Sequence, residues 1–229
     1  MENSLYNKSV VCPVCNKKVE VTKVKTKDCV ISSRDTDFCI YYEGINPMFY
    51  DSWVCEFCGY ASLSEKFESL SKVFVNPIKN SIALNWKTRK FCGERDVDKA
   101  LEAYKLALLS LSYTKPKASE LAKVSIRIAW LYRIKKDEDN EMDFLRHTLN
   151  FYHEIYEKED LPIGKLDKYT CMYMIAELSR RIEKHEDALS WFSKVLSSPE
   201  ARANKLLIEN ARDQAILIRE QRKRVKVSV

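Results

Sequence analysis

Cys55-Glu56-Phe57-Cys58-Gly59-Tyr60 repeats a spacing that is already present at Cys12-Pro13-Val14-Cys15, where two thiols also stand two residues apart. Two residues between cysteines suit a tight turn that presents both sulfurs on one side. Pro13 fixes φ in the first turn, and Gly59 can supply the positive φ that the end of the second turn often needs. Four thiolates form a closed tetrahedral ligand set that is typical of structural Zn²⁺. We therefore predict one zinc ion with four ligands: Cys12, Cys15, Cys55 and Cys58.

The two cysteine pairs lie far apart in the sequence, with 39 residues between Cys15 and Cys55. A zinc ribbon accepts such an insert, because strands or a loop can fill the space between two fixed corners. Lys18–Lys25 alternates polar and apolar residues and predicts a half-exposed strand, and the aromatic and β-branched Tyr50–Val54 predicts another. A redox role for the cysteine pairs is the alternative, but no thioredoxin-like βαβ pattern surrounds either pair. We expect a small antiparallel ribbon that needs its metal to be stable.

The segment from Ser33 to Tyr42 combines two carboxylates, an arginine, a thiol and three aromatic side chains. One interpretation is a binding loop, or a second cation site that uses Asp35 and Asp37. The other interpretation is a turn whose aspartates bond to nearby backbone and whose aromatic rings pack on the helical part. Cys39, like Cys29, has no partner at knuckle spacing, so we interpret both as structural thiols.

After Tyr60 the hydrophobic period changes from two to 3.6 residues, which predicts helices. Tyr169–Leu196 is similar to a tetratricopeptide (TPR) repeat, with Ala176 and Ala188 where two antiparallel helices would touch and a polar corner at Lys184–Asp187. Two further hairpins and a final helix are predicted along the same lines. Their helices are Ile82–Phe91 with Asp96–Tyr113, Ala118–Lys135 with Glu138–Lys158, and the capping helix Leu206–Ile218.

These patterns predict a mainly α fold, in which TPR-like antiparallel helical hairpins follow a small N-terminal β zinc ribbon. The expected domains are a zinc-ribbon-like domain at 1–61, a TPR-like helical domain at 62–218 and a basic tail at 219–229. The tail and the three residues before it carry five basic and one acidic side chain, which is +4 of the net charge of +6. The rest of the chain is close to neutral, so the sequence does not indicate a broad nucleic-acid surface.

Composition and motifs also limit the class of protein. No apolar run approaches the roughly 20 residues that span a bilayer, and the N-terminus lacks a signal-peptide pattern. Eight cysteines without a secretory signal favour a reducing compartment, so we expect a cytoplasmic protein. Neither a P-loop nor the nucleophile and zinc-protease motifs occur, so we assign no catalytic residue and no cofactor other than zinc.

Several motifs together resemble one bacterial family, that of domain of unknown function 2225. They are C-P-V-C near the start, R-D-T-D-F-C at 34–39, I-N-P-x-x-Y at 45–50, W-V-C-x-x-C-G-Y-A at 53–61, A-W-L-Y-R at 129–133 and A-E-L-S-R-R at 176–181. The resemblance covers nearly the whole chain. It implies a zinc ribbon followed by TPR-like helices, a cytoplasmic bacterial protein and no established activity. It also suggests that R-D-T-D-F-C helps to pack the ribbon on the helices.

Three functional hypotheses follow from the sequence. The favoured hypothesis is a non-catalytic scaffold that binds a protein or peptide in a helical groove. The second is nucleic-acid binding through the ribbon and the basic tail, with a salt-dependent affinity. The third is an enzyme with a site between the ribbon and the helices that uses Asp35, Asp37 or Cys39. The sequence does not define the partner or the oligomeric state.

Overall fold

The computed structural model describes residues 4–227, with side chains through Lys223. The fold is mainly helical, with small antiparallel sheets near the N-terminus, as the sequence predicts. Its contacts divide it into two compact units. The first holds the residues up to Arg34 together with Ile40–Glu141, and the second holds Asp35–Cys39 together with the residues from Met142 onward. None of the boundaries between these units falls at residue 61. The domain boundaries expected from the sequence remain a prediction.

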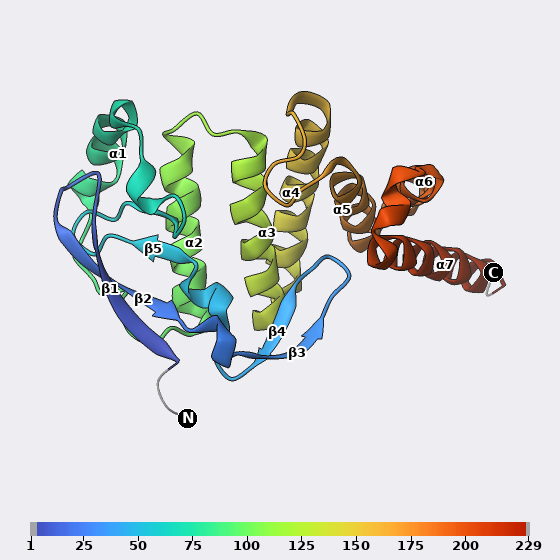
Figure 1. Cartoon of the computed structure of the whole chain (residues 1–229), viewed down its shortest axis with the longest axis horizontal. Helices are drawn as coiled ribbons and strands as arrows, with labels where there is room; N and C mark the ends of the chain where they lie inside the picture. The colour runs from blue at the N-terminus through green and yellow to red at the C-terminus, as the bar shows by residue number, and fades with distance from the viewer. Residues whose placement is uncertain (1–3, 228–229) are drawn as a thin grey trace. The chain divides into compact units, whose positions relative to one another are not determined.

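The sheets are three separate two-stranded antiparallel hairpins (Figure 1). They pair β1 (Leu5–Val11) with β2 (Lys18–Val24), β3 (Val30–Arg34) with β4 (Ile40–Glu43), and β5 (Ser52–Val54) with β6 (Ala61–Leu63). In β2 the side chains of Val19 and Val21 are buried whereas Lys18 and Glu20 are exposed, as the alternating sequence predicts. The first and third hairpins each enclose one pair of cysteines in their turn.

The first unit also contains α1 (Val75–Ser81), α2 (Val97–Ser112) and α3 (Ala118–Lys135). Asp96 caps α2, because its carboxylate accepts the backbone N–H of Lys99 at 2.7 Å. The buried face of α2 includes three alanines, and their small side chains let the β5–β6 hairpin approach closely. Two buried serines connect the layers: Ser52 Oγ donates to the carbonyl of Ala103 at 3.0 Å, and Ser110 Oγ accepts the N–H of Ala61 at 3.1 Å.

The predicted helix Ile82–Phe91 is wrong. Only a short 3-10 turn, Ala83–Asn85, forms there, and the chain from Trp86 to the start of α2 is irregular. The reason is a tertiary contact: the indole N–H of Trp86 donates to the carbonyl of Glu56 at 2.7 Å, in the second cysteine turn. That contact holds Trp86 in an extended backbone conformation, with φ −77° and ψ 129°, so the helical periodicity of this segment is overridden.

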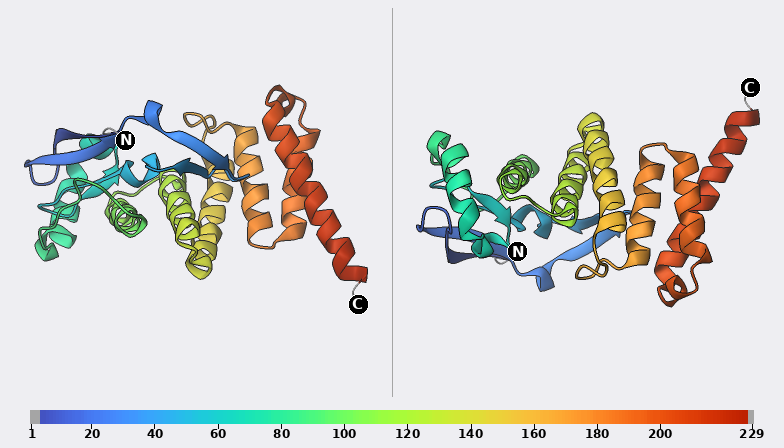
Figure 2. Two further views of the ribbon diagram at one scale, coloured as in Figure 1. Left: turned by 90° about the horizontal axis from the view of Figure 1, so that it is seen from below. Right: turned by 90° about the horizontal axis from the view of Figure 1, so that it is seen from above.

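The second unit is built from α4 (Glu138–Lys158, whose first turn belongs to the first unit), α5 (Lys168–Arg181), α6 (His185–Ser197) and α7 (Lys205–Val227). Figure 2 shows α5, α6 and α7 side by side in both views, and each contacts the other two. The bounds predicted for α3 and α4 match the structure. Glu141, which departs from the alanine of a TPR repeat, is largely buried and pairs with Arg133 at 2.7 Å.

The helix α7 extends well beyond the predicted Leu206–Ile218, so most of the expected basic tail is helical. Within it, Arg222 pairs with Glu186 of α6. Residues 228 and 229 of the tail lie outside the described residues, as do the side chains of Arg224 and Lys226. Among the helices of residues 4–227, none is both long and apolar enough to cross a membrane. The TPR-like character of the hairpins remains a prediction.

Candidate metal centre

The two hairpin turns bring the four predicted cysteines together. Their Sγ atoms all lie within 4.8 Å of one another. Cys12 Sγ is 3.6 Å from Cys58 Sγ, and Cys15 Sγ is 3.5 Å from Cys55 Sγ, so each close pair joins the first turn to the second. A disulfide would bring the sulfurs to about 2.05 Å, so no disulfide joins any of the four. The arrangement is a cluster of four free thiols from two segments of the chain.

Both cysteine turns have the same backbone conformation. In the first, Cys12 accepts the N–H of Asn16 at 2.9 Å and donates its own N–H to Lys17 at 3.0 Å. In the second, Cys55 accepts the N–H of Gly59 at 2.9 Å and donates to Tyr60 at 2.8 Å. The fifth residue of each turn has a positive φ, 59° at Asn16 and 74° at Gly59. Asparagine and glycine tolerate this conformation better than other residues, which is why they occur there.

The difference between Asn16 and Gly59 has a steric cause. A Cβ added to Gly59 would lie 2.4 Å from Cε3 of Trp86 and 3.0 Å from Cγ2 of Ile82. The Trp86 ring therefore lies directly on the backbone of the second turn, and only glycine leaves room for it. The irregular segment that replaces the predicted helix thus covers the second pair of cysteines.

The cysteines belong to the hydrophobic core of this part of the first unit. Cys12 and Cys55 are fully buried, Cys58 is 3% exposed, and Cys15 is half-buried. Around them pack apolar side chains from the two hairpins and from the segment between Phe67 and Ile82: Val10, Val14, Val19, Val21, Trp53, Tyr60, Phe67, Ile78 and Ile82. This core is small, so a metal that joins the two turns would supply much of its stability.

Crowding perturbs the acidity of the thiols strongly. Hydrogen bonds from the thiols of Cys12 and Cys58 lower the pKa of Cys55, and hydrogen bonding to Cys55 raises the pKa of Cys12. Without added positive charge, a Cys55 thiolate would accept hydrogen bonds from the S–H groups of its neighbours. A divalent cation supplies the charge that lets all four cysteines ionise together.

The donor set fits a tetrahedral metal ion. With metal–sulfur bonds of about 2.3 Å, the sulfurs of a regular tetrahedron lie about 3.8 Å apart. The two close Sγ–Sγ distances, 3.5 and 3.6 Å, are near this value, and all four sulfurs lie within 4.8 Å of one another. Cys12, Cys15, Cys55 and Cys58 can therefore hold a metal ion together.

The other candidate segment, Asp35–Cys39, forms a tight turn at the tip of the β3–β4 hairpin. Phe38 N donates to the carbonyl of Asp35 at 3.0 Å, and Asp35 N donates to the carbonyl of Cys39 at 2.8 Å. Phe38 has a φ of 69°, a conformation that usually selects glycine. Its ring packs on that of Tyr173, with 5.5 Å between the centroids. This aromatic contact offsets the strained backbone of Phe38.

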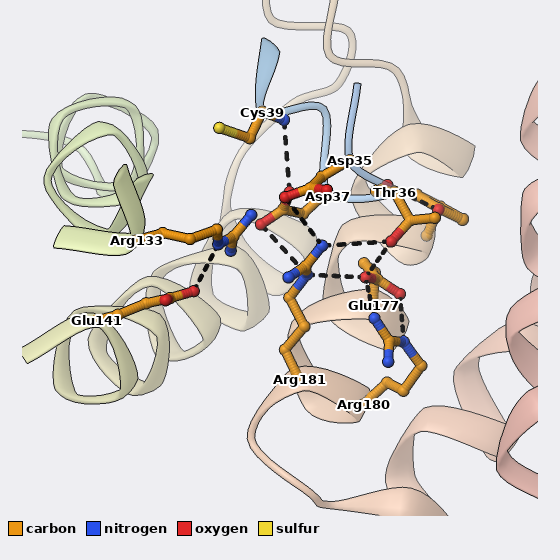
Figure 3. Close-up of polar contacts among 10 residues, drawn as sticks. Asp35, Thr36, Asp37, Cys39, Arg133, Glu141, Glu177, Arg180 and Arg181 are labelled. Carbon is orange, nitrogen blue, oxygen red and sulfur yellow. Dashed lines mark hydrogen bonds and ion pairs between the residues drawn. The ribbon is translucent and has the colours of Figure 1, made fainter. Parts of the chain in front are cut away.

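Below the turn, Glu177 of α5 lies at the centre of a buried ionic network (Figure 3). Its carboxylate accepts from Arg180 at 2.7 and 2.8 Å, from Arg181 at 2.9 Å and from the hydroxyl of Thr36 at 2.6 Å. Arg181 Nε also lies 3.3 Å from the carboxylate of Asp37. Asp37 and Glu177 are fully buried, so guanidinium groups compensate their charges inside the unit.

The chain matches the model of a family described as an uncharacterized protein conserved in bacteria (DUF2225), over residues 5–218. The chain belongs to the DUF2225 family. The family predicted from the sequence motifs is therefore confirmed. No match was found among curated proteins or among solved structures. Both the four cysteines and the buried network lie within the DUF2225 match.

For this DUF2225 chain, the structure favours the turn interpretation of Asp35–Cys39. Arg181 lies within 3.7 Å of both Asp35 and Asp37, so a protein cation takes the place that a second metal would need. Sequence reasoning missed Glu177, Arg180 and Arg181 as partners of this turn. The available signal was the run Glu177-Leu178-Ser179-Arg180-Arg181, which puts a glutamate among apolar core positions of a helix with two arginines three and four residues later.

Proposed function

We propose that this protein is a non-catalytic scaffold that binds other proteins and that one structural Zn²⁺ on Cys12, Cys15, Cys55 and Cys58 stabilises it. The observation that carries the zinc assignment is the cluster of four sulfurs within 4.8 Å, from two turns of the same conformation. Four protein ligands leave no open coordination position for water or substrate, so the ion would act in folding and not in catalysis.

The choice of zinc rests on the chemistry of the ligands. Thiolates are soft donors, and a tetrahedral set of four favours Zn²⁺ or iron over Mg²⁺ and Ca²⁺, which prefer oxygen. Zinc has no redox chemistry and accepts a buried tetrahedral site without strain. A reducing, cytoplasmic setting, which we also propose, would keep the four thiols available to the ion.

The scaffold assignment rests on the layered helices of the second unit. α7 packs against α5 and α6, yet its Leu206, Ile216 and Leu217 side chains are 62%, 44% and 39% exposed. Helical layers with exposed apolar side chains often bind a partner helix or peptide. We propose that a protein partner, and not a nucleic acid, is the ligand of this unit.

Native mass spectrometry of protein purified without added metal tests the zinc assignment. The expected mass shift is that of one zinc ion per wild-type chain. The Cys55→Ser, Cys58→Ser variant should carry none, and the Cys29→Ser variant, which changes a thiol outside the cluster, should carry one. Iron in the wild type would replace zinc in the proposal, and metal retained by the double variant would contradict the assigned ligands.

The scaffold assignment needs a separate test. The protein would be used to capture partners from a bacterial lysate, alongside a Leu206→Ser, Ile216→Ser, Leu217→Ser variant with the same zinc content. A partner that binds the wild type at high salt and is lost with the variant supports the assignment. Capture of nucleic acid that disappears at high salt would instead favour the nucleic-acid hypothesis.

A further inference from the structure

The first unit contains a pocket that has no part in the metal centre. Its volume is about 690 Å³, within the range of small-molecule sites. It is lined by the start of β1, the residues just before β3, the end of β4 with the segment after it, and the residues just before α2. None of the four clustered cysteines is among the lining residues, so this feature goes beyond the proposed zinc and scaffold function.

At the pocket, Arg95 is a buried cation, with only 5% of its surface exposed. Its Nε donates to the carbonyl of Phe91 at 3.0 Å, and its Nη1 donates to those of Phe49 at 3.0 Å and Ser52 at 2.7 Å. These bonds use three of its five N–H groups. Within residues 4–227, Nη2 makes no hydrogen bond and no carboxylate forms an ion pair with Arg95. A buried positive charge thus remains without a negative partner.

Tyr50 supplies a second donor at the same pocket. Its hydroxyl accepts the backbone N–H of Arg95 at 3.0 Å, so its own proton points elsewhere. Tyr50 is 4% exposed, and it lines the pocket with Arg95. Burial lowers the pKa of Arg95, and the groups that act against this effect are phenols and a thiol instead of a carboxylate. The guanidinium of Arg95 also lies over the Tyr50 ring, 5.7 Å from its centroid. Two buried donors and a cation with no carboxylate partner among the described residues make this part of the pocket suited to an anion.

The rest of the pocket has the opposite charge. Asp28, Glu43 and Glu94 line it and are exposed to solvent. Their carboxylates form no ion pair within the described residues, so they remain available to a cationic group at the pocket opening. Acidic surface residues alone would say little, but here they accompany the buried cation of the same pocket.

We propose that this pocket binds a small zwitterionic ligand, with a carboxylate at Arg95 and Tyr50 and an ammonium group near Asp28, Glu43 and Glu94. The buried donors fix the anionic end, because charge-assisted hydrogen bonds are strongest away from water. The exposed carboxylates contribute less to affinity, because solvent and salt screen them. They select ligands that carry a positive end over simple carboxylates.

NMR titration of the zinc-loaded, ¹⁵N-labelled full-length protein tests this assignment. The probes are glycine, 4-aminobutyrate and 6-aminohexanoate, with acetate and hexylamine as single-charge controls. We expect at least one amino acid to shift the amide signals of Gly44, Asn46 and Arg95 and to bind more tightly than acetate or hexylamine. If no probe shifts these signals at tens of millimolar, the pocket does not bind this class of ligand and the proposal is wrong.

Variants separate the two ends of the ligand. Glu43→Gln with Glu94→Gln should weaken amino-acid binding about threefold to tenfold and leave acetate unchanged, since exposed ion pairs contribute little each. Tyr50→Phe should weaken the binding of the amino acids and of acetate. Near-UV circular dichroism checks that this variant is folded. Glu20→Gln with Glu138→Gln, which removes two exposed carboxylates outside the pocket, is the matched charge control. Equal weakening by this control and by the Glu43, Glu94 pair would mean a general charge effect and would overturn the ammonium assignment.

Discussion

The candidate metal centre and the Glu177 network differ in the source of the positive charge that balances their buried acidic groups. Each places several ionisable groups in a buried site, four thiols in one and the carboxylates of Asp37 and Glu177 in the other. Within the described residues no basic side chain forms an ion pair or hydrogen bond with these thiols, so a bound metal ion could supply the balancing charge. The carboxylates carry their cations within the chain, as Arg180 and Arg181. The first site could therefore take its compensating charge from a bound metal ion, whereas the second carries its own within the chain.

Metal removal should give the largest difference in stability between the two regions. We expect chelation, or Cys55→Ser with Cys58→Ser, to unfold the hairpins that contain β1, β2, β5 and β6, because structural zinc contributes about 10–16 kcal/mol in small zinc domains. Amide hydrogen exchange should rise in these strands while α5 and α6 stay protected. Loss of protection in α5 and α6 to the same extent would show that the two units do not differ in their need for metal.

Glu177→Ala should have the next largest effect, and it should spare the metal centre. The change leaves Arg180 and Arg181 without their shared buried carboxylate, which costs about 3–5 kcal/mol of unfolding free energy. Urea unfolding measures the loss, and zinc content should stay at one ion per chain. Glu186→Gln is the control: Glu186 is 75% exposed and pairs with Arg222, so its loss should cost less than about 1 kcal/mol.

Gly59→Ala tests how tightly the second cysteine turn is covered. The added methyl group would overlap the ring of Trp86 and would also disfavour the positive φ, so we expect a loss of about 2–4 kcal/mol. Gly44→Ala is a matched control, because Gly44 has a φ of 77° but no atom within 4 Å of an added Cβ, and it should cost only about 1 kcal/mol. Thermal unfolding of the zinc-loaded proteins measures the difference, and equal losses would contradict the proposed role of Trp86.

Substitutions of Phe38 should give the smallest change in stability. They test how the Asp35–Cys39 turn is stabilised. Phe38→Ala loses the contact with Tyr173 and keeps a strained backbone, whereas Phe38→Gly loses the contact but relaxes the strain. We expect Phe38→Gly to be about 1 kcal/mol more stable than Phe38→Ala. Urea unfolding of both variants checks the order, and the reverse order would mean that φ at Phe38 carries no strain.

Predictions from the sequence were correct where the spacing of residues along the chain identifies the structure. The cysteine pairs identify the four sulfurs, and the 3.6-residue period defines the bounds of α3 and α4. The predictions failed where a distant contact overrides the local pattern. Trp86 bonds to the cysteine turn in place of continuing a helix, and Glu177 lies 141 residues from its partner Thr36. Neither contact leaves a periodic trace, so no window of neighbouring residues could reveal it.

The turn Asp35–Cys39 also has a consequence for how the protein is made. The ribosome releases the hairpins β1–β2 and β5–β6 early, so the cysteine cluster can close once the chain has passed Leu63. The turn that lies between these hairpins in the sequence belongs to the second unit, and its partner Arg181 is synthesised much later. Until then Asp37 has no guanidinium from α5 and must stay in water. The cysteine cluster can therefore form during synthesis before the Asp35–Cys39 turn contacts the C-terminal helices.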